Sequence, residues 1–535
     1  MSDTQKKQNF LQGTALLAMA ALFVKLVGAL YKVPLNAIIG EKGFGYFTTA
    51  YEIYNILLMI STAGLPVAMS RMISESSSLG NYGQVRQIYT TARRIFLILG
   101  VSGSLLMTLF CRQLAAYWNQ PDAWAAIGFL GPCVLFICVM SAYRGYFQGQ
   151  SNMIPTAVSQ VLEVIVKLAV GMLAAVALLK LTSSIPLAAG GAILGVTASC
   201  IVSVFYLSGR FRASYRELPQ TGDSPKSFRA TAWELLRIAL PITLSSTCLS
   251  IVTSLSSKIY MGRLLESGIT QEAADTMRGI HVMTQTIYNM PCALITPITV
   301  SIIPAITALV AQKKYREIRM TEESAIRVTG IFAMPCAVGL MCLAQPVTAF
   351  LGGYSGGKLA LATQMMMVLG ASIVFNALVL VTTAIMQSHG NVNRPVINMI
   401  IGGVLKLIVV YVLTGNPAIG IVGTPIGTLG SYVVICILNV LSIRSLVEDP
   451  PRIVKNLIRP LLAACVMGIV VWLSWRGMAQ LPLPQGRLGS ALEAIVPVCV
   501  GAAVYLFTAA KFQVLTREDC LLLPKGEKIA KLLRL

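Results

Sequence analysis

The sequence predicts an all-α membrane protein that crosses the bilayer about fourteen times. Of its 535 residues, 56% are hydrophobic and only 12% are charged, whereas about 25% of the residues of a soluble domain are charged. Apolar runs of roughly 20 residues, long enough to cross about 30 Å of hydrocarbon, recur from Phe10 to Phe507. These runs leave little room for a water-soluble domain.

The apolar runs form two groups of six and a final pair. The first group of predicted spans is 10–38, 47–70, 93–111, 124–144, 154–179 and 187–208. The second group is 238–262, 279–310, 327–346, 360–387, 396–414 and 418–443, and the final pair is 457–475 and 491–510. We therefore predict a six-helix lobe (1–215), a second six-helix lobe (216–450), and two C-terminal helices with a basic tail (451–535).

Basic residues predict the orientation of the chain in a bacterial cytoplasmic membrane. A formal net charge of +21 could indicate a nucleic-acid partner. We expect none, because the Lys and Arg residues stand in short loops rather than on one polar face. If the N-terminus is cytoplasmic, the loops on that side hold the basic clusters at 210–216 and 313–319, and the opposite loops are much poorer. The positive-inside rule then places both termini in the cytoplasm.

Neither an enzyme nor a metal site is predicted. The twelve Cys lie mostly inside apolar runs without C-x-x-C spacing, and the only His are His281 and His389. The chain contains no G-x-x-x-x-G-K-[ST] loop and no H-E-x-x-H motif. We expect no cofactor, and a driving force from an ion gradient, the membrane potential or consumption of the product rather than from ATP.

An internal repeat relates the two groups of six. The segment Gln148–Pro155, followed by Lys167, is echoed by Gln387–Pro395, followed by Lys406. Because six is even, the two repeats have the same orientation in the membrane. Parallel repeats of this kind are a transporter architecture, with the substrate site between the halves.

Charged residues inside the spans are costly, and each is a candidate functional residue. Lys25 and Lys32 are seven residues apart, so they project from one face of the first helix, which could receive a phosphate. Alternatively, Lys32 reaches to the outer headgroups. Glu52 and Asn55 share a face of the second helix. We expect Glu52 to be the counter-ion of a first-helix lysine, either at the substrate site or in a packing pair.

The remaining candidates lie further along the chain. Glu163 and Lys167 stand four residues apart, which predicts a structural ion pair. Lys406 occupies the repeat-equivalent position of Lys167 without an acid one turn back, so its charge is expected to meet an anion. Lys258 and Asn289, in the seventh and eighth spans, complete the predicted substrate-binding set.

Four motifs carry a resemblance to a known family. They are FVKLVG at 23–28, GFGY at 43–46, GLP at 64–66 and YRGYFQG at 143–149. In this order they resemble the stage V sporulation protein B and polysaccharide-exporter branch of the multidrug/oligosaccharidyl-lipid/polysaccharide (MOP) superfamily. The chain is also similar to MurJ-type lipid II flippases, and the resemblance extends from Phe10 to about Phe507.

The resemblance implies two six-helix lobes around a cationic cavity, with two extra helices beside a lipid-tail groove. Lys25 falls where the flippases have a cavity arginine, and Lys32 lies close to a second one. Two other basic positions of the flippases fall near Met59 and Thr286 in this chain. The seventh span lacks the carboxylate of the family's sodium site, so we do not expect coupling to sodium.

The resemblance also implies a function. We expect an alternating-access flippase that moves a polyprenyl-diphosphate-linked cell-wall precursor, lipid II first of all, to the outer leaflet. Such a transporter serves peptidoglycan, polysaccharide or spore-wall synthesis, and we expect a monomer with cell-wall synthesis enzymes as candidate partners. One alternative is a cation-coupled multidrug antiporter of the same superfamily, and another is a scaffold for those enzymes.

Overall fold

The computed structural model describes the chain at residues 3–59, 64–150, 152–220, 223–311, 314–391, 393–480, 482, 484, 486–512 and 514. Within these ranges the side chains of some helical residues lie outside the description, among them those of 3–22, Lys25, 244–250 and 296–305. The regular structure of the described part is entirely helical.

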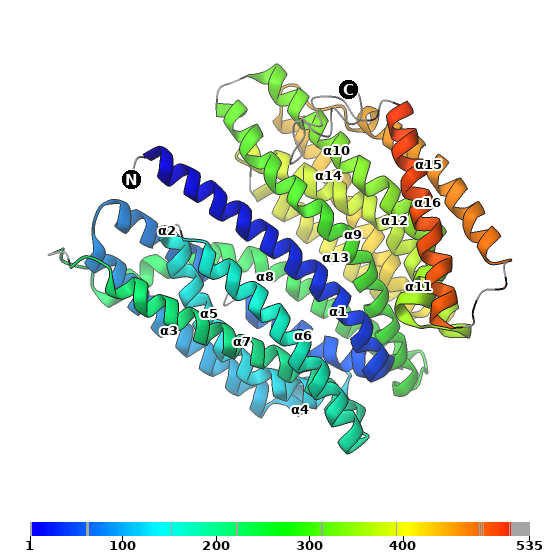
Figure 1. The fold of residues 1–535 in the computed structure, drawn as a ribbon, viewed down its shortest axis with the longest axis horizontal. Coiled ribbons are helices and arrows are strands. Elements are labelled where there is room, and N and C mark those ends of the chain that lie inside the picture. Colours follow the sequence, from blue (N-terminus) through cyan, green and yellow to red (C-terminus); the bar gives the residue numbers. More distant parts are fainter. Residues whose placement is uncertain are drawn as a thin grey trace. The chain divides into compact units, whose positions relative to one another are not determined.

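The helices follow one another with short connections (Figure 1). The chain begins with α1 (Asp3–Met59), α2 (Leu65–Ser78), α3 (Tyr82–Leu109), α4 (Cys111–Tyr117), η2 (Pro121–Ala123), α5 (Trp124–Gly149), α6 (Ile154–Thr182) and α7 (Ile185–Arg216). It continues with α8 (Phe228–Glu266), α9 (Gln271–Ala311), α10 (Tyr315–Cys342), α11 (Ala344–Gly352) and α12 (Gly356–Ser388). It ends with α13 (Asn393–Thr414), η3 (Gly420–Val422), α14 (Gly423–Leu446), α15 (Ile453–Met478) and α16 (Arg487–Lys511).

The element α1 consists of two helices joined at a kink. Gly40 has φ 70° and ψ 176°, which is not helical and suits a residue without a Cβ. The second predicted span, 47–70, begins in the part of α1 after this kink and continues into α2. Its residues 60–63 lie outside the described residues.

The chain is an all-α polytopic membrane protein. In the described part, 10 helices are long and apolar enough to cross a membrane, and each coincides with one of the predicted spans. The other four predicted spans fall in α1, α2, α8 and α9, and three of these helices contain side chains outside the description.

The chain divides into two compact units, which we describe separately. The first unit holds residues 1–265 and 269–279, and the second holds 266–268 and 280–535. In the first unit α7 packs on α5 and α6, and α1 packs on α6. Glycines allow this closeness, because a Cβ on Gly195 of α7 would lie 2.3 Å from the backbone nitrogen of Gly171 on α6.

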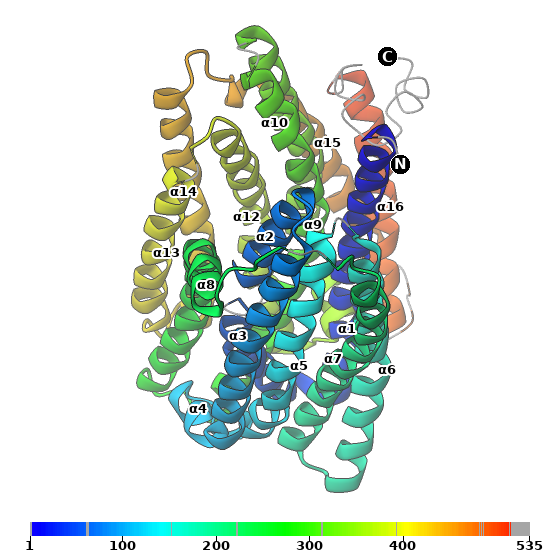
Figure 2. The ribbon, with the colours of Figure 1, turned by 90° about the vertical axis from the view of Figure 1, so that its left-hand side faces the viewer.

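The second unit is held together by apolar packing and a buried amide network. In it α10 packs on α12 and α15, and α15 on α16, while α13 and α14 lie side by side (Figure 2). The buried Asn439 of α14 donates to the hydroxyls of Thr382 (3.0 Å) and Thr383 (3.2 Å) on α12 and accepts a bond from Asn398 of α13 (2.9 Å). Interhelical bonds of this kind fix the helix register in a membrane.

Candidate functional site

The guanidinium of Arg278, in the first unit, is a completely buried charge. Its side chain is 0% exposed, and its Nη2 donates to Oε2 of Glu52 on α1 at 2.9 Å. Its Nη1 donates to the hydroxyls of Ser257 (2.8 Å) and Tyr260 (2.9 Å) on α8. Ser257 in turn donates to Oε1 of Glu52 at 2.9 Å. Both carboxylate oxygens are therefore satisfied, as a buried ion pair requires.

A second polar network positions Arg278 by fixing the start of α9. The carboxylate of Asp275 accepts bonds from Gln120 (2.7 Å), Gln271 (2.8 Å) and Tyr46 (3.1 Å). Burial raises the pKa of Asp275 above its usual range, and these hydrogen bonds oppose that shift. Gly279 is needed here, because a Cβ would lie 1.9 Å from the carbonyl oxygen of Glu41.

The structure shows an arginine partner for each of the two acids that the sequence places in ion pairs. Glu52 is bound by Arg278. The side chain of Lys25, a first-helix lysine, lies outside the described residues. Glu163 is bound by Nη2 of Arg144 on α5 at 3.1 Å, not by Lys167. The reason is geometric, because Nε of the same guanidinium donates to Ser159, one turn before Glu163, at 3.0 Å.

Two lysines of the first unit lie close enough to repel one another. The charges of Lys32 on α1 and Lys167 on α6 repel each other, and burial removes much of the water around Lys32. Among the described residues, neither ammonium has a carboxylate partner. Two cations that repel one another, without a carboxylate partner among the described residues, form a site that a divalent anion would stabilise.

A tyrosine hydroxyl adds a donor beside these lysines. Tyr31 is 3% exposed, and its hydroxyl has no hydrogen-bond partner among the described residues. It lies against Gly171, one turn beyond Lys167 on α6. Tyr51 and Tyr54 of α1 form an aromatic pair, with ring centroids 5.7 Å apart. The cations Lys32 and Lys167 and the Tyr31 hydroxyl thus combine positive charge with a hydrogen-bond donor, which suits a phosphorylated headgroup.

The other predicted site residues have different surroundings. The Nζ atom of Lys258 lies 3.2 Å from the ring centroid of Tyr117, a cation–π contact within the first unit. Asn55 of α1 is half-buried. In the second unit, Asn289 of α9 is exposed and Lys406 of α13 is half-buried.

Sequence reasoning missed four ionisable groups that the structure places in buried or half-buried pairs. Arg278 stands one residue before the predicted span 279–310, and Arg144 closes the predicted span 124–144. In the second unit, Nε2 of His389 lies 2.7 Å from Oε1 of the buried Glu322. Helices α9 and α10 begin before the predicted spans, so a search of the preceding turns could have found Arg278 and Glu322, whereas Arg144 lies inside its predicted span. In the described residues, no group of three or more metal-ligating side chains occurs.

The fold is that of solved transporters of the MOP superfamily. The chain belongs to the family described as polysaccharide biosynthesis protein, whose profile matches residues 10–310.

Full-length relatives come from Bacillus subtilis (strain 168). The uncharacterized membrane protein YabM is 24% identical, over 98% of this chain and 96% of its own length. The lipid II flippase MurJ is 23% identical, over 93% of this chain and 94% of its own. Stage V sporulation protein B is 23% identical, over 97% and 98%.

Solved structures show the same fold. The lipid II flippase MurJ in an inward closed conformation matches with a TM-score of 0.68 at 13% identity, over 94% of this chain and 98% of that one. An inward-facing multidrug resistance MATE family transporter matches with a TM-score of 0.66 at 17% identity, over 80% and 97%.

Proposed function

We propose that this chain is an alternating-access flippase that moves a polyprenyl-diphosphate-linked cell-wall precursor, lipid II first of all, from the cytoplasmic to the outer leaflet. The observation that carries the proposal is the Lys32–Lys167 pair, two cations that repel one another and have no carboxylate partner among the described residues. A diphosphate supplies two neighbouring negative charges, which relieve the repulsion between the lysines. The hydroxyl of Tyr31 supplies a further donor.

The relatives support this substrate class. Two proteins that align with more than nine tenths of this chain are named as a lipid II flippase and a stage V sporulation protein. In this proposal the chain has fourteen spans in two six-helix lobes and a final pair, and it works as a monomer in peptidoglycan, polysaccharide or spore-wall synthesis. We keep Lys25 and Lys258 as proposed headgroup contacts, and the assignments of Asn55, Asn289 and Lys406 stay predictions.

A cation-coupled multidrug antiporter is the alternative, and it has a structural relative in the MATE transporter. An organic cation would need an available carboxylate inside the membrane. In the described part of the first unit, Glu52 is bound by Arg278 and Glu163 by Arg144. This pairing favours a transporter of anions.

We expect flipping to persist when sodium is replaced by potassium. The acids that would bind a sodium ion in the first unit are held by arginines, and the seventh predicted span contains no acidic residue. The measurement compares initial flipping rates in proteoliposomes made with sodium or potassium salts at equal ionic strength. A rate that vanishes in potassium would contradict the prediction.

Both termini are proposed to lie in the cytoplasm. A Cys at Ser267, in the turn between α8 and α9, should react with a membrane-impermeant maleimide added to intact cells, and a Cys at the exposed Ala213 should not. The unmodified chain is the control, because its own Cys465 and Cys499 are exposed. Labelling at Ala213→Cys but not at Ser267→Cys would reverse the orientation.

The substrate class is tested with purified protein in liposomes. Fluorescent lipid II and an undecaprenyl-monophosphate-linked glycan are supplied in parallel, and the fraction reaching the opposite leaflet is measured with a membrane-impermeant quencher. We expect movement of lipid II and much slower movement of the monophosphate, since it carries less charge for the two lysines. Movement of a lipophilic cation instead of either lipid would favour the antiporter.

A further inference from the structure

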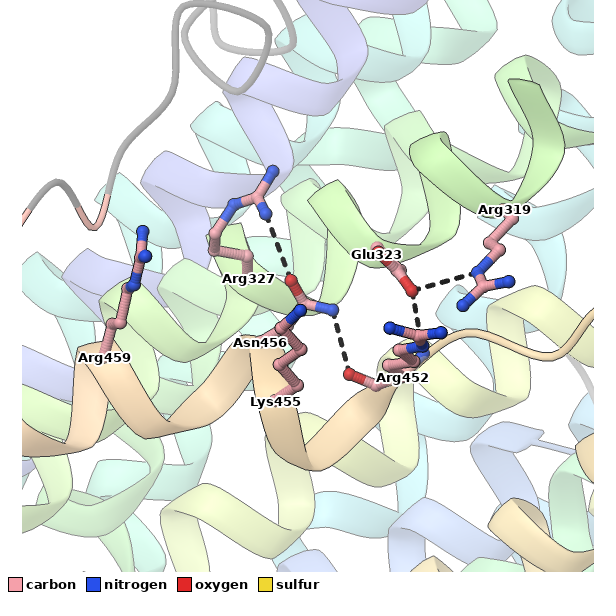
Figure 3. A pocket seen from close by; sticks show the side chains of 7 residues that line it. All are labelled: Arg319, Glu323, Arg327, Arg452, Lys455, Asn456 and Arg459. Atoms are coloured by element: carbon pink, nitrogen blue, oxygen red, sulfur yellow. Dashed lines mark hydrogen bonds and ion pairs between the residues drawn. The ribbon is translucent and has the colours of Figure 1, made fainter. Parts of the chain in front are cut away.

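The second unit contains a cationic pocket of its own. Helices α10 and α15 border a pocket of about 270 Å³ (Figure 3). Five of its seven lining side chains are basic and one is acidic. Such an excess of positive charge in a hollow is typical of phosphate-binding sites.

The face of α10 contributes Arg319, Glu323 and Arg327, spaced one helical turn apart. The only acid in the lining, Glu323, is already neutralised, because its Oε1 accepts bonds from Nε of Arg319 (3.2 Å) and from the backbone nitrogen of Arg452 (3.0 Å). Arg319 also pairs with Asp449 at the rim. These bonds connect α10 to the start of α15. With five basic residues and one acid in the lining, the pocket keeps a net positive charge.

The face of α15 contributes Arg452, Lys455, Asn456 and Arg459. Asn456 is fixed in place, since it accepts a bond from Nη1 of Arg327 (3.1 Å) and donates to the carbonyl of Arg452 (2.9 Å). The side chains of Arg452 and Lys455 are exposed and form no ion pair among the described residues. Both cations therefore remain available to a ligand.

The place of the pocket in the fold indicates what kind of ligand reaches it. Helices α10 and α15 are both candidate membrane spans, and both contribute residues of their N-terminal halves, so they enter the membrane from the same side. The pocket thus lies at the level of the lipid headgroups. Next to its basic residues, α15 exposes Val454 (71%), Ile458 (48%) and Leu462 (54%), which form an apolar surface for acyl chains.

We propose that this pocket binds the phosphate groups of an anionic phospholipid of the surrounding leaflet. The phosphates contact Arg452 and Lys455, and the acyl chains lie along the exposed apolar side of α15. A free phosphate offers the same charge but gains nothing from the apolar surface. The site is independent of the transported substrate, so it stands or falls separately from the flippase proposal.

The test is native mass spectrometry of the full-length protein titrated with single lipids. The probes are cardiolipin, phosphatidylglycerol, phosphatidylcholine and inorganic pyrophosphate. The variant Arg452→Gln with Lys455→Gln removes two charges, and Arg444→Gln is the matched control, because it removes an exposed charge at the end of α14 outside the pocket. Melting temperatures of all three proteins establish that they are folded.

We expect the double variant to bind the two anionic lipids about 30-fold more weakly, from roughly 1 kcal/mol for each basic residue near a membrane surface. The control variant should bind them like the wild type, and phosphatidylcholine should bind all proteins equally. An unchanged affinity in the double variant, or an equal loss in the control, would overturn the site. Pyrophosphate that binds as tightly as the lipids would overturn the lipid assignment in favour of a free phosphate.

Discussion

Replacing Lys167 by Glu should abolish binding of a polyprenyl-diphosphate sugar and at the same time raise the melting temperature of the purified protein. The new carboxylate would attract Lys32 where the lysine repels it. The site would then lose one cation and gain an anion. At about 1.5 to 3 kcal/mol for each hydrogen bond to a charged group, we expect binding at least about 100-fold weaker.

The measurements are a melting curve in detergent and a titration with a soluble short-chain analogue of the substrate. The matched control is Lys180→Glu, because it makes the same change in the last turn of the same helix, α6. That variant should bind like the wild type. A Lys167→Glu protein that melts lower than the wild type would mean that Lys167 has a stabilising partner, contrary to the proposed repulsion.

Replacing Arg278 by Leu should cause the largest loss of stability of any single substitution discussed here. It leaves the carboxylate of Glu52, whose side chain is only 13% exposed, without its charged partner. Removing one member of a buried ion pair costs about 3 to 5 kcal/mol. We expect little folded protein after extraction, measured as the monodisperse fraction in size-exclusion chromatography.

The double variant Arg278→Met with Glu52→Gln separates the loss of charge balance from the loss of packing. Because no charge is left unpaired, most of the folded fraction should return. Failure of this rescue would show that the guanidinium bonds to Ser257 and Tyr260, rather than the ion pair, hold α8 and α9 together.

Much of the fold could be predicted from the sequence, because the signal is local. An apolar run of bilayer length has few alternatives to a helix, and ten of the predicted spans coincide with candidate membrane helices. The exact ends could not be predicted. Helix α9 begins at Gln271 and not near residue 279, because its first turns are held by the polar network around Asp275.

The candidate site was harder to predict, because its bonds join distant parts of the chain. Arg278 and Glu52 are 226 residues apart in sequence, and no local pattern relates them. The rule for residues four apart selected Lys167 as the partner of Glu163, but Arg144 of a neighbouring helix takes that place. Tertiary packing thus leaves Lys167 without a carboxylate partner among the described residues. Lys32, by contrast, was identified from the cost of a charge inside a span.

Transbilayer movement of lipid II by the double variant Lys32→Gln with Lys167→Gln is the decisive measurement. The assay uses proteoliposomes with equal amounts of wild-type or variant protein, each checked for its melting temperature. Both lysines bind the diphosphate in our proposal, and neither has a carboxylate to strand among the described residues. We therefore predict a variant that melts no lower than the wild type and moves lipid II no faster than protein-free liposomes. A variant that flips lipid II at the wild-type rate would contradict the proposed site.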